Sequence, residues 1–209
     1  MKLFITTVGL YLISCIAYAQ SFEGKIIYHN TYKSKSPNIN DKQYTDMLGD
    51  TQKYSIKGGN YKSEVNGRMI LWQLYNAHDG RIYSKMSITP TVLFNDESSN
   101  KDEVLSSEIH KNAAIILGYK CDELLLQCKS GVQKYYYSSK LPVDSKLYAN
   151  HKFGNWNVVM AKINAVPLKM EIDNNQLTLI SVATEIKPMK INNSFFELPA
   201  NTPVQKSSY

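Results

Sequence analysis

The sequence predicts a mainly β protein of about ten antiparallel strands with a few short helices. Apolar and polar residues alternate with a period of two over most of the chain, as in half-buried strands. Turn residues rich in Gly, Asn and Asp separate these runs. The chain has 15 tyrosines, which suit such strands because the ring packs while the hydroxyl reaches water. The pattern leaves open a barrel, a sandwich or one strongly curved sheet.

The N-terminal half is typical of a meander of neighbouring strands. We expect these strands over residues 22–32, 53–57, 61–65, 68–75 and 81–88. Gly58-Gly59-Asn60 and Asn66-Gly67 supply hairpin turns. A short helix is expected over residues 41–48, with Asp41 as its cap and Gly49 as its stop.

The C-terminal half continues with longer strands. They are expected over residues 105–117, 119–128, 132–138, 166–172 and 176–186. Residues 142–150 are compatible with a short helix, whereas residues 151–161 look irregular. The tail after residue 188 is expected to hold a short edge segment at residues 195–199 and then a frayed end.

Residues 1–19 have the anatomy of a secretory signal peptide. Lys2 precedes an apolar run that is too short for a membrane span of ~20 residues, and Ala17-Tyr18-Ala19 forms a small-x-small cleavage site. We therefore expect cleavage after Ala19 and one β-rich domain over residues 20–209, periplasmic or secreted. A minority alternative is a lipoprotein anchored through Cys15.

The net charge and the cysteine spacing bear on two questions, whether the chain binds nucleic acid and whether it forms a disulfide. The net charge of +6 comes without a basic-aromatic motif, so no nucleic-acid partner is expected. Cys121 and Cys128 are seven residues apart on one expected strand, which points them to opposite faces. That spacing disfavours a disulfide between them.

No catalytic motif is present in the sequence. It lacks H-E-x-x-H, G-x-S-x-G and the P-loop, and its four histidines are not paired at helical spacing. The acidic pairs Asp96-Glu97 and Asp102-Glu103 are interpreted as solubilising. We therefore expect a protein that is not an enzyme and that uses no metal or cofactor.

The expected strand over residues 68–75 is apolar on both faces. Ile70, Trp72 and Leu74 share one face, and Met69, Leu71 and Tyr75 share the other. One face can join the core, and the other needs a cover. A short helix or loop, a partner, or a ligand are the three candidates.

Several short segments carry a resemblance to a known family. In chain order they are Phe22-Glu23-Gly24-Lys25-Ile26-Ile27-Tyr28, Leu117-Gly118-Tyr119-Lys120-Cys121, Tyr135-Tyr136-Tyr137-Ser138, Leu141-Pro142, Pro167-Leu168-Lys169-Met170-Glu171, Ala183-Thr184-Glu185-Ile186-Lys187 and Phe195-Phe196-Glu197-Leu198-Pro199. In these the chain resembles uncharacterised envelope proteins of Gram-negative bacteria related to the GLPGLI proteins, distant members of the lipoprotein-carrier (LolA/LppX-like) superfamily. The chain departs from the family where Ala165-Val166-Pro167-Leu168-Lys169 replaces the Gly-Leu-Pro-Gly-Leu-Ile element.

The resemblance implies a single strongly curved antiparallel sheet, a half-open barrel whose concave apolar face carries acyl chains. With the doubly apolar strand, it leads us to expect a lipid or acyl ligand. A cavity of ~300 Å³ or more, lined by aliphatic and aromatic side chains, would strongly favour this hypothesis. The expected wall residues are Trp72, Leu74, Val166, Leu168 and Met170. The alternatives are a structural module that contacts an envelope protein partner and, third, an envelope hydrolase.

Overall fold

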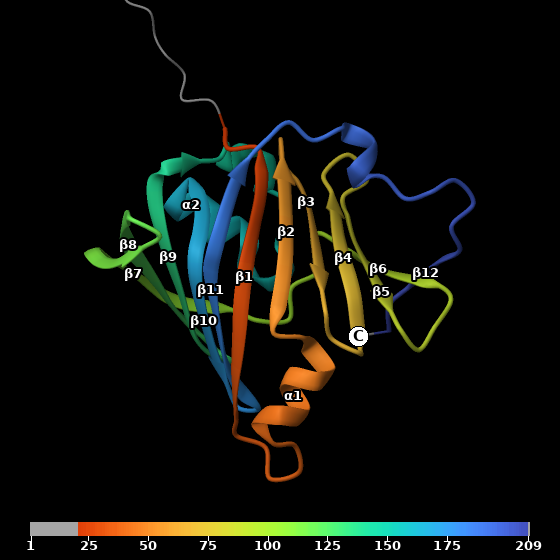
Figure 1. The fold of residues 1–209 in the computed structure, drawn as a ribbon, viewed down its shortest axis with the longest axis horizontal. Coiled ribbons are helices and arrows are strands. Elements are labelled where there is room, and N and C mark those ends of the chain that lie inside the picture. Colours follow the sequence, from red (N-terminus) through yellow and green to blue (C-terminus); the bar gives the residue numbers. More distant parts are fainter. Residues whose placement is uncertain (1–20, 209) are drawn as a thin grey trace, which may run out of the picture.

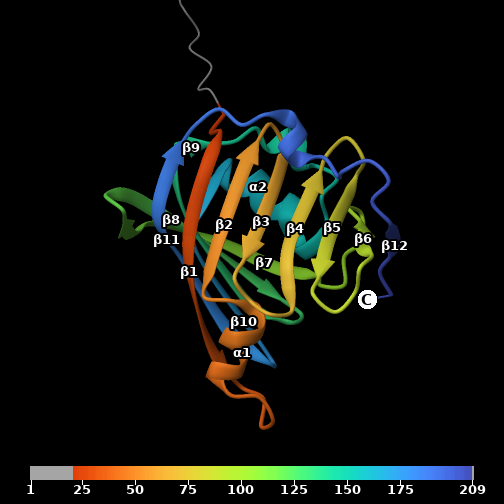
Figure 2. The same cartoon turned by 45° about the vertical axis from the view of Figure 1, so that its right-hand side comes forward.

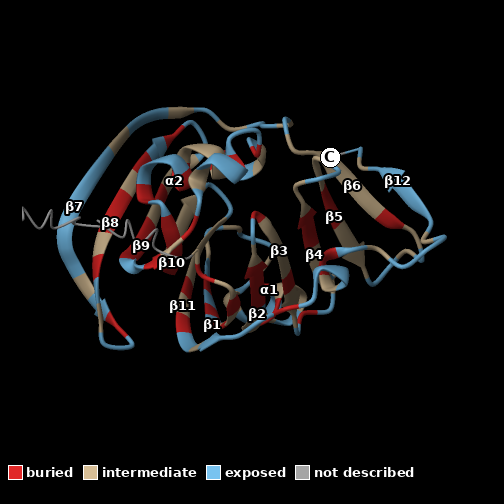
Figure 3. Ribbon diagram, turned by 90° about the horizontal axis from the view of Figure 1, so that it is seen from above, coloured by how far each residue is buried: buried red, intermediate tan, exposed pale blue. Residues whose placement is uncertain are grey.

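The computed structural model describes residues 21–208, and its strands form one twelve-stranded sheet. Seen from above, the strands follow an arc that does not close, and helix α2 lies on the inner side (Figure 3). The strand order is β12-β6-β5-β4-β3-β2-β1-β11-β10-β9-β8-β7. The expected curved, half-open, mainly β fold is confirmed. The expected signal peptide, its cleavage site and Cys15 lie outside the described residues.

Neighbouring strands pair antiparallel, as the arrows of β2, β3 and β4 show in Figure 1. The exception is β12, which pairs parallel with β6. The strands are β1 Gly24–Ser34, β2 Thr51–Lys57, β3 Asn60–Val65, β4 Ile70–Asn76, β5 Arg81–Met86, β6 Val92–Asp96, β7 Val104–Ile116, β8 Tyr119–Cys128, β9 Gly131–Pro142, β10 Ala165–Asn174, β11 Leu177–Pro188 and β12 Val204–Lys206. The helices are α1 Asp41–Leu48 and α2 Trp156–Ile163, with short 3-10 turns η1 Ser145–Tyr148, η2 Phe153–Asn155 and η3 Asn193–Phe196.

Helix α1 spans the expected residues, but its cap is one residue earlier than expected. The Asn40 side chain accepts a hydrogen bond from the Gln43 backbone N–H, and the Gln43 side chain accepts one from the Asn40 N–H, both at 2.9 Å. This reciprocal pair is a capping box. Gly49 ends the helix with φ 87°, a conformation that favours glycine.

Two sequence expectations were wrong. Residues 151–161 are not irregular: Val159, Met160 and Ile163 are spaced to share one helical face, and that face is buried. The tail is not frayed, since η3 replaces the expected edge segment and β12 extends the sheet. Strand β12 pairs with β6, a strand that the sequence analysis did not predict.

The core lies on both sides of the sheet. Two buried clusters fill the concave side, where α2 packs against the sheet. A third lies on the convex side, where Phe196 and Ile191 cover Leu74, Tyr83 and Val92. Figure 2 shows the blue C-terminal segment that carries these two residues running from β11 across the ends of the neighbouring strands toward β12. The second apolar face of the strand around Leu74 is therefore covered by the short helical turn η3, one of the three expected covers.

Two acidic residues that were interpreted as solubilising are structural. The Tyr75 hydroxyl donates to Glu97 Oε2 at 2.6 Å, and the Glu97 carbonyl accepts the Lys152 and Phe153 N–H groups. Asp102 accepts from the Ser130 backbone N–H and hydroxyl. Both residues fasten loops to the sheet, a role that depends on contacts remote in sequence.

Candidate functional site

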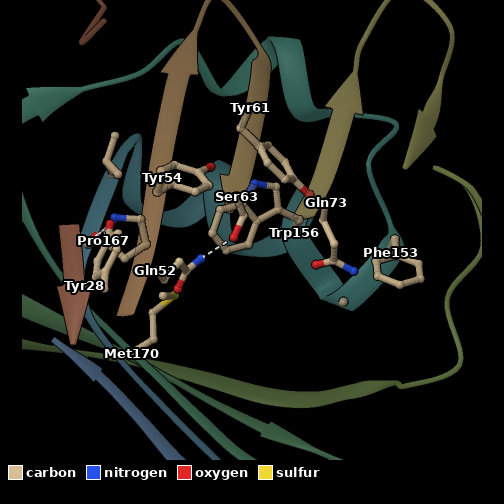
Figure 4. Close-up of a pocket in the computed structure, with 12 residues that line it drawn as sticks. Tyr28, Gln52, Tyr54, Tyr61, Ser63, Gln73, Phe153, Trp156, Pro167 and Met170 are labelled. Atoms are coloured by element: carbon tan, nitrogen blue, oxygen red, sulfur yellow. Dashed lines mark hydrogen bonds between the residues drawn. The ribbon is translucent and has the colours of Figure 1, made fainter. Parts of the chain in front are cut away.

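A cavity of about 200 Å³ lies between the concave face of the sheet and the segment that leads into α2 (Figure 4). Strands β1 to β4 and β10 provide most of its wall, and η2 with the start of α2 closes it. The lining residues are Tyr28, Gln52, Tyr54, Tyr61, Ser63, Gln73, Phe153, Gly154, Trp156, Val166, Pro167 and Met170. The volume is below the ~300–1,000 Å³ of sites that enclose drug-sized ligands, and so does not reach the size that would strongly favour a lipid carrier.

Aromatic rings form one part of the wall. Strand register places Tyr54 opposite Ile26 and beside Tyr28, while Tyr61 is on the next strand. The rings of Tyr54 and Tyr61 stack with centroids 5.4 Å apart, and Trp156 meets Tyr61 edge-on at 6.4 Å. The Tyr28 hydroxyl donates to the Pro167 carbonyl at 2.7 Å, which ties β1 to β10.

Uncharged polar side chains form another part. Gln52 Nε2 donates to Ser63 Oγ at 2.8 Å, and Gln73 Nε2 donates to Ser84 Oγ at 3.2 Å. These residues share the concave face because Tyr54 pairs with Ser63 and Ser63 with Gln73 in the ladder. Figure 4 shows the Gln52 amide below the Tyr54 ring and the Gln73 amide beside the Phe153 ring.

Two lining residues carry buried polar atoms that lack a hydrogen-bond partner. They are the Tyr54 hydroxyl and the Trp156 indole Nε1. Burial raises the pKa of Tyr28, Tyr54 and Tyr61 well above the ordinary value, so all three phenols stay uncharged. An unpaired buried polar atom costs about 1–3 kcal/mol.

His151 lies behind the aromatic wall. Its Nε2 is 2.9 Å from the Tyr61 hydroxyl, its ring centroid is 4.1 Å from that of Tyr75, and its Nδ1 has no partner. Burial lowers the pKa of His151 to about 4, so the ring is neutral at neutral pH. The layer behind the cavity therefore adds no positive charge at this position.

The segment that closes the cavity is held by unusual backbone geometry. Gly154 and Asn155 both have positive φ, 63° and 62°. The buried Asn155 side chain accepts a hydrogen bond from Asn100 Nδ2 at 2.7 Å. This anchor turns the chain so that Phe153 and Trp156 both reach the cavity.

The structure brings together only part of the wall residues expected from the sequence. Val166 and Met170 line the cavity, and Leu168 is buried in the adjoining core. Trp72 and Leu74 pack on the opposite, convex side of the sheet. Ligand contact by any of the five residues stays a prediction, but the cavity adjoins only Val166, Leu168 and Met170.

Most of the cavity wall was missed by sequence reasoning. Tyr28, Tyr54, Tyr61, Gln52 and Gln73 each alternate correctly along their strands, and this was the available signal. Alternation assigns a residue to a face but does not tell which face is concave.

A larger hollow, lined mainly by polar groups, lies on another part of the surface. It lies at Lys57, Asn60 and Asn76 and measures about 640 Å³. Its main polar groups already bind protein partners: Asn60 accepts the Ala77 N–H, and Asn76 donates to the Phe196 carbonyl. The smaller cavity, whose wall combines aromatic rings with uncharged polar side chains, is therefore the better candidate.

Cys121 and Cys128 are free and buried, in agreement with the expectation that the spacing disfavours a disulfide. Within residues 21–208, no cluster of three His, Cys, Asp or Glu residues is arranged to hold a metal ion. None of the helices in this part of the chain has the length and apolar character needed to cross a membrane.

No protein-family model matches the chain, and no curated protein matches it. Among solved structures, the chain is similar to the LolA superfamily protein NE2245 from Nitrosomonas europaea. The two share 10% sequence identity with a TM-score of 0.40, over 86% of this chain and 91% of that chain. The likeness is a distant one, and the resemblance to the GLPGLI proteins is not confirmed.

Proposed function

We propose that this protein is a non-enzymatic binding protein that holds a hydrophobic ligand, a lipid or acyl chain, in the cavity beneath α2. The observation that carries the proposal is the cavity itself, walled by aromatic and aliphatic side chains with a few uncharged polar side chains among them. A well-formed apolar pocket with a few convergent polar groups is the usual form of a small-molecule site.

Binding would draw its free energy from burial of apolar surface. Each methylene that leaves water contributes ~0.8 kcal/mol. Met170 and Val166 offer aliphatic contacts, and Tyr28, Tyr54 and Trp156 offer ring faces. Since the cavity measures only about 200 Å³, it takes one short chain with its polar end, or the polar end of a longer ligand.

Native mass spectrometry of protein purified from its own envelope tests the proposal. We expect a bound species whose mass matches a lipid and which leaves on mild activation. Met170→Trp should abolish it by filling the cavity, whereas Met189→Trp, at an exposed position, should not. A ligand-free mass, with no uptake of the uncharged fluorescent probe N-phenylnaphthylamine, would contradict the proposal.

The proposed location is the periplasm or the exterior, reached after removal of residues 1–19. The mass of the mature N-terminal peptide tests it. We expect a peptide that begins at Gln20, and a lipid-modified Cys15 would instead indicate an anchored protein.

A second candidate function is contact with an envelope protein partner. Strand β7 is an edge of the sheet and exposes Leu105, Ile109 and Ile115. Such an edge can pair with a strand of another protein. Recovery of one stoichiometric partner that is lost on Ile109→Lys substitution, with no lipid, would favour this function.

A further inference from the structure

We infer that the polar end of the ligand is uncharged, as in an alcohol, ester or amide, and is not a free carboxylate or phosphate. The inference rests on the proposed function and specifies its ligand. None of the twelve described residues that line the cavity carries a charge.

Strand alternation keeps the nearby lysines off this face. Lys53 precedes Tyr54, and Lys62 lies between Tyr61 and Ser63, so both side chains point to the convex side. Lys62 Nζ lies 5.6 Å from the centroid of the Trp72 ring and 4.8 Å from that of Phe195, both on the convex side. These strands therefore leave an anionic head group in the cavity without a cation.

The polar groups that do face the cavity suit a neutral oxygen. Gln52 and Gln73 each use one amide N–H in a bond to serine, and each amide has a second N–H and a carbonyl oxygen. A hydroxyl, ester or amide head can both donate to and accept from such groups.

Charge decides between the two kinds of head group. Burying a carboxylate without a paired cation is far more costly than burying a hydrogen-bonded neutral group. A fatty acid and its monoglyceride bury the same chain, so the apolar contribution cancels between them. We expect the monoglyceride to bind at least about tenfold more tightly, which corresponds to ~1.4 kcal/mol.

The chain offers an intrinsic reporter for this comparison. It has two tryptophans: Trp156 lines the cavity, and Trp72 packs on the opposite side of the sheet. In the Trp72→Phe variant, all tryptophan emission therefore comes from the cavity. Decanoic acid and monodecanoylglycerol are titrated against this emission at about pH 8, where the acid is ionised.

A variant that introduces a positive charge sharpens the test. Gln73→Lys places a cation at the cavity wall and should raise the affinity for decanoic acid relative to the monoglyceride. Gln205→Lys adds the same charge at an exposed position on β12. It should change neither the affinity for decanoic acid nor that for the monoglyceride.

The outcomes separate the inference from the proposed function. Preference for the monoglyceride, reversed or weakened by Gln73→Lys, supports the inference. Equal affinity, or preference for decanoic acid, overturns it and leaves the proposed function standing. Binding of neither compound, nor of N-phenylnaphthylamine, overturns both.

Discussion

At the scale of single residues, His151 combines full burial with an incomplete set of hydrogen bonds. Its ring packs on Tyr61 and Tyr75, and the Tyr75 hydroxyl in turn donates a hydrogen bond to the Glu97 carboxylate. Burial lowers the pKa of His151 from 6.5 to about 4, so the folded protein resists a proton that the unfolded chain accepts. The free energy of unfolding is therefore unaffected by this histidine above pH ~6.5. It falls as the pH drops toward ~4, by up to about 3 kcal/mol.

We expect His151→Gln to flatten this decline. Urea unfolding of the native protein and the variant at several pH values between about 7 and 4 measures it. His110→Gln is the matched control, since the nearby Glu123 raises the pKa of His110 and gives the opposite sign. Its stabilisation is present below pH ~6.5 and is lost as the pH rises. An unchanged pH profile in His151→Gln would contradict the role of burial.

At the scale of elements, the closing segment depends on Asn155. Its left-handed backbone is tolerated by Asn and Gly but costs other residues about 1–2 kcal/mol, and its side chain holds the loop at Asn100. We expect Asn155→Ala to lower the free energy of unfolding by about 2 kcal/mol, and Asn155→Gly by less. Equal losses in urea unfolding would mean that the backbone conformation contributes nothing.

The turn η3 is the cover of the convex side. Phe196 is 1% exposed and packs with Leu74 and Tyr83, whereas Phe195 is half-buried. We expect Phe196→Ala to lower the free energy of unfolding by about 3 kcal/mol and Phe195→Ala by less. Monoglyceride affinity should be unchanged in both. A loss of binding in Phe195→Ala, with the fold intact, would instead place the ligand beside Trp72 and Leu74.

Sequence periodicity predicted the elements well where local signals were strong. Gly58-Gly59 marked its hairpin, and Gly49 marked the end of α1. Helix α2 was missed because Gly154 and the non-helical conformation of Asn155 directly precede its short apolar face. Strand β12 was missed because three residues are too few for a periodic pattern, and β6 pairs with it only in the fold.

At the scale of the whole molecule, curvature decides which residues form the site. The sheet bends around α2, so Tyr28, Tyr61 and Met170 approach one another from strands far apart in sequence (Figure 4). Val166 and Met170 could be predicted as wall residues, because they alternate on one strand. Trp72 and Leu74 alternate equally well but face the convex side. The direction of bending follows from packing against α2, which no local pattern contains.

The central claim is that a hydrophobic ligand occupies the cavity between the concave face and α2. Photo-crosslinking with an uncharged alkyl diazirine, followed by peptide mapping, tests it most directly. We expect labels on the peptide that contains Met170 and on the peptide that contains Phe153 and Trp156. Monodecanoylglycerol should reduce this labelling by competing with the diazirine probe. Labels confined to the convex side, at Trp72 and Phe195, or labels that no competitor removes, would contradict the claim.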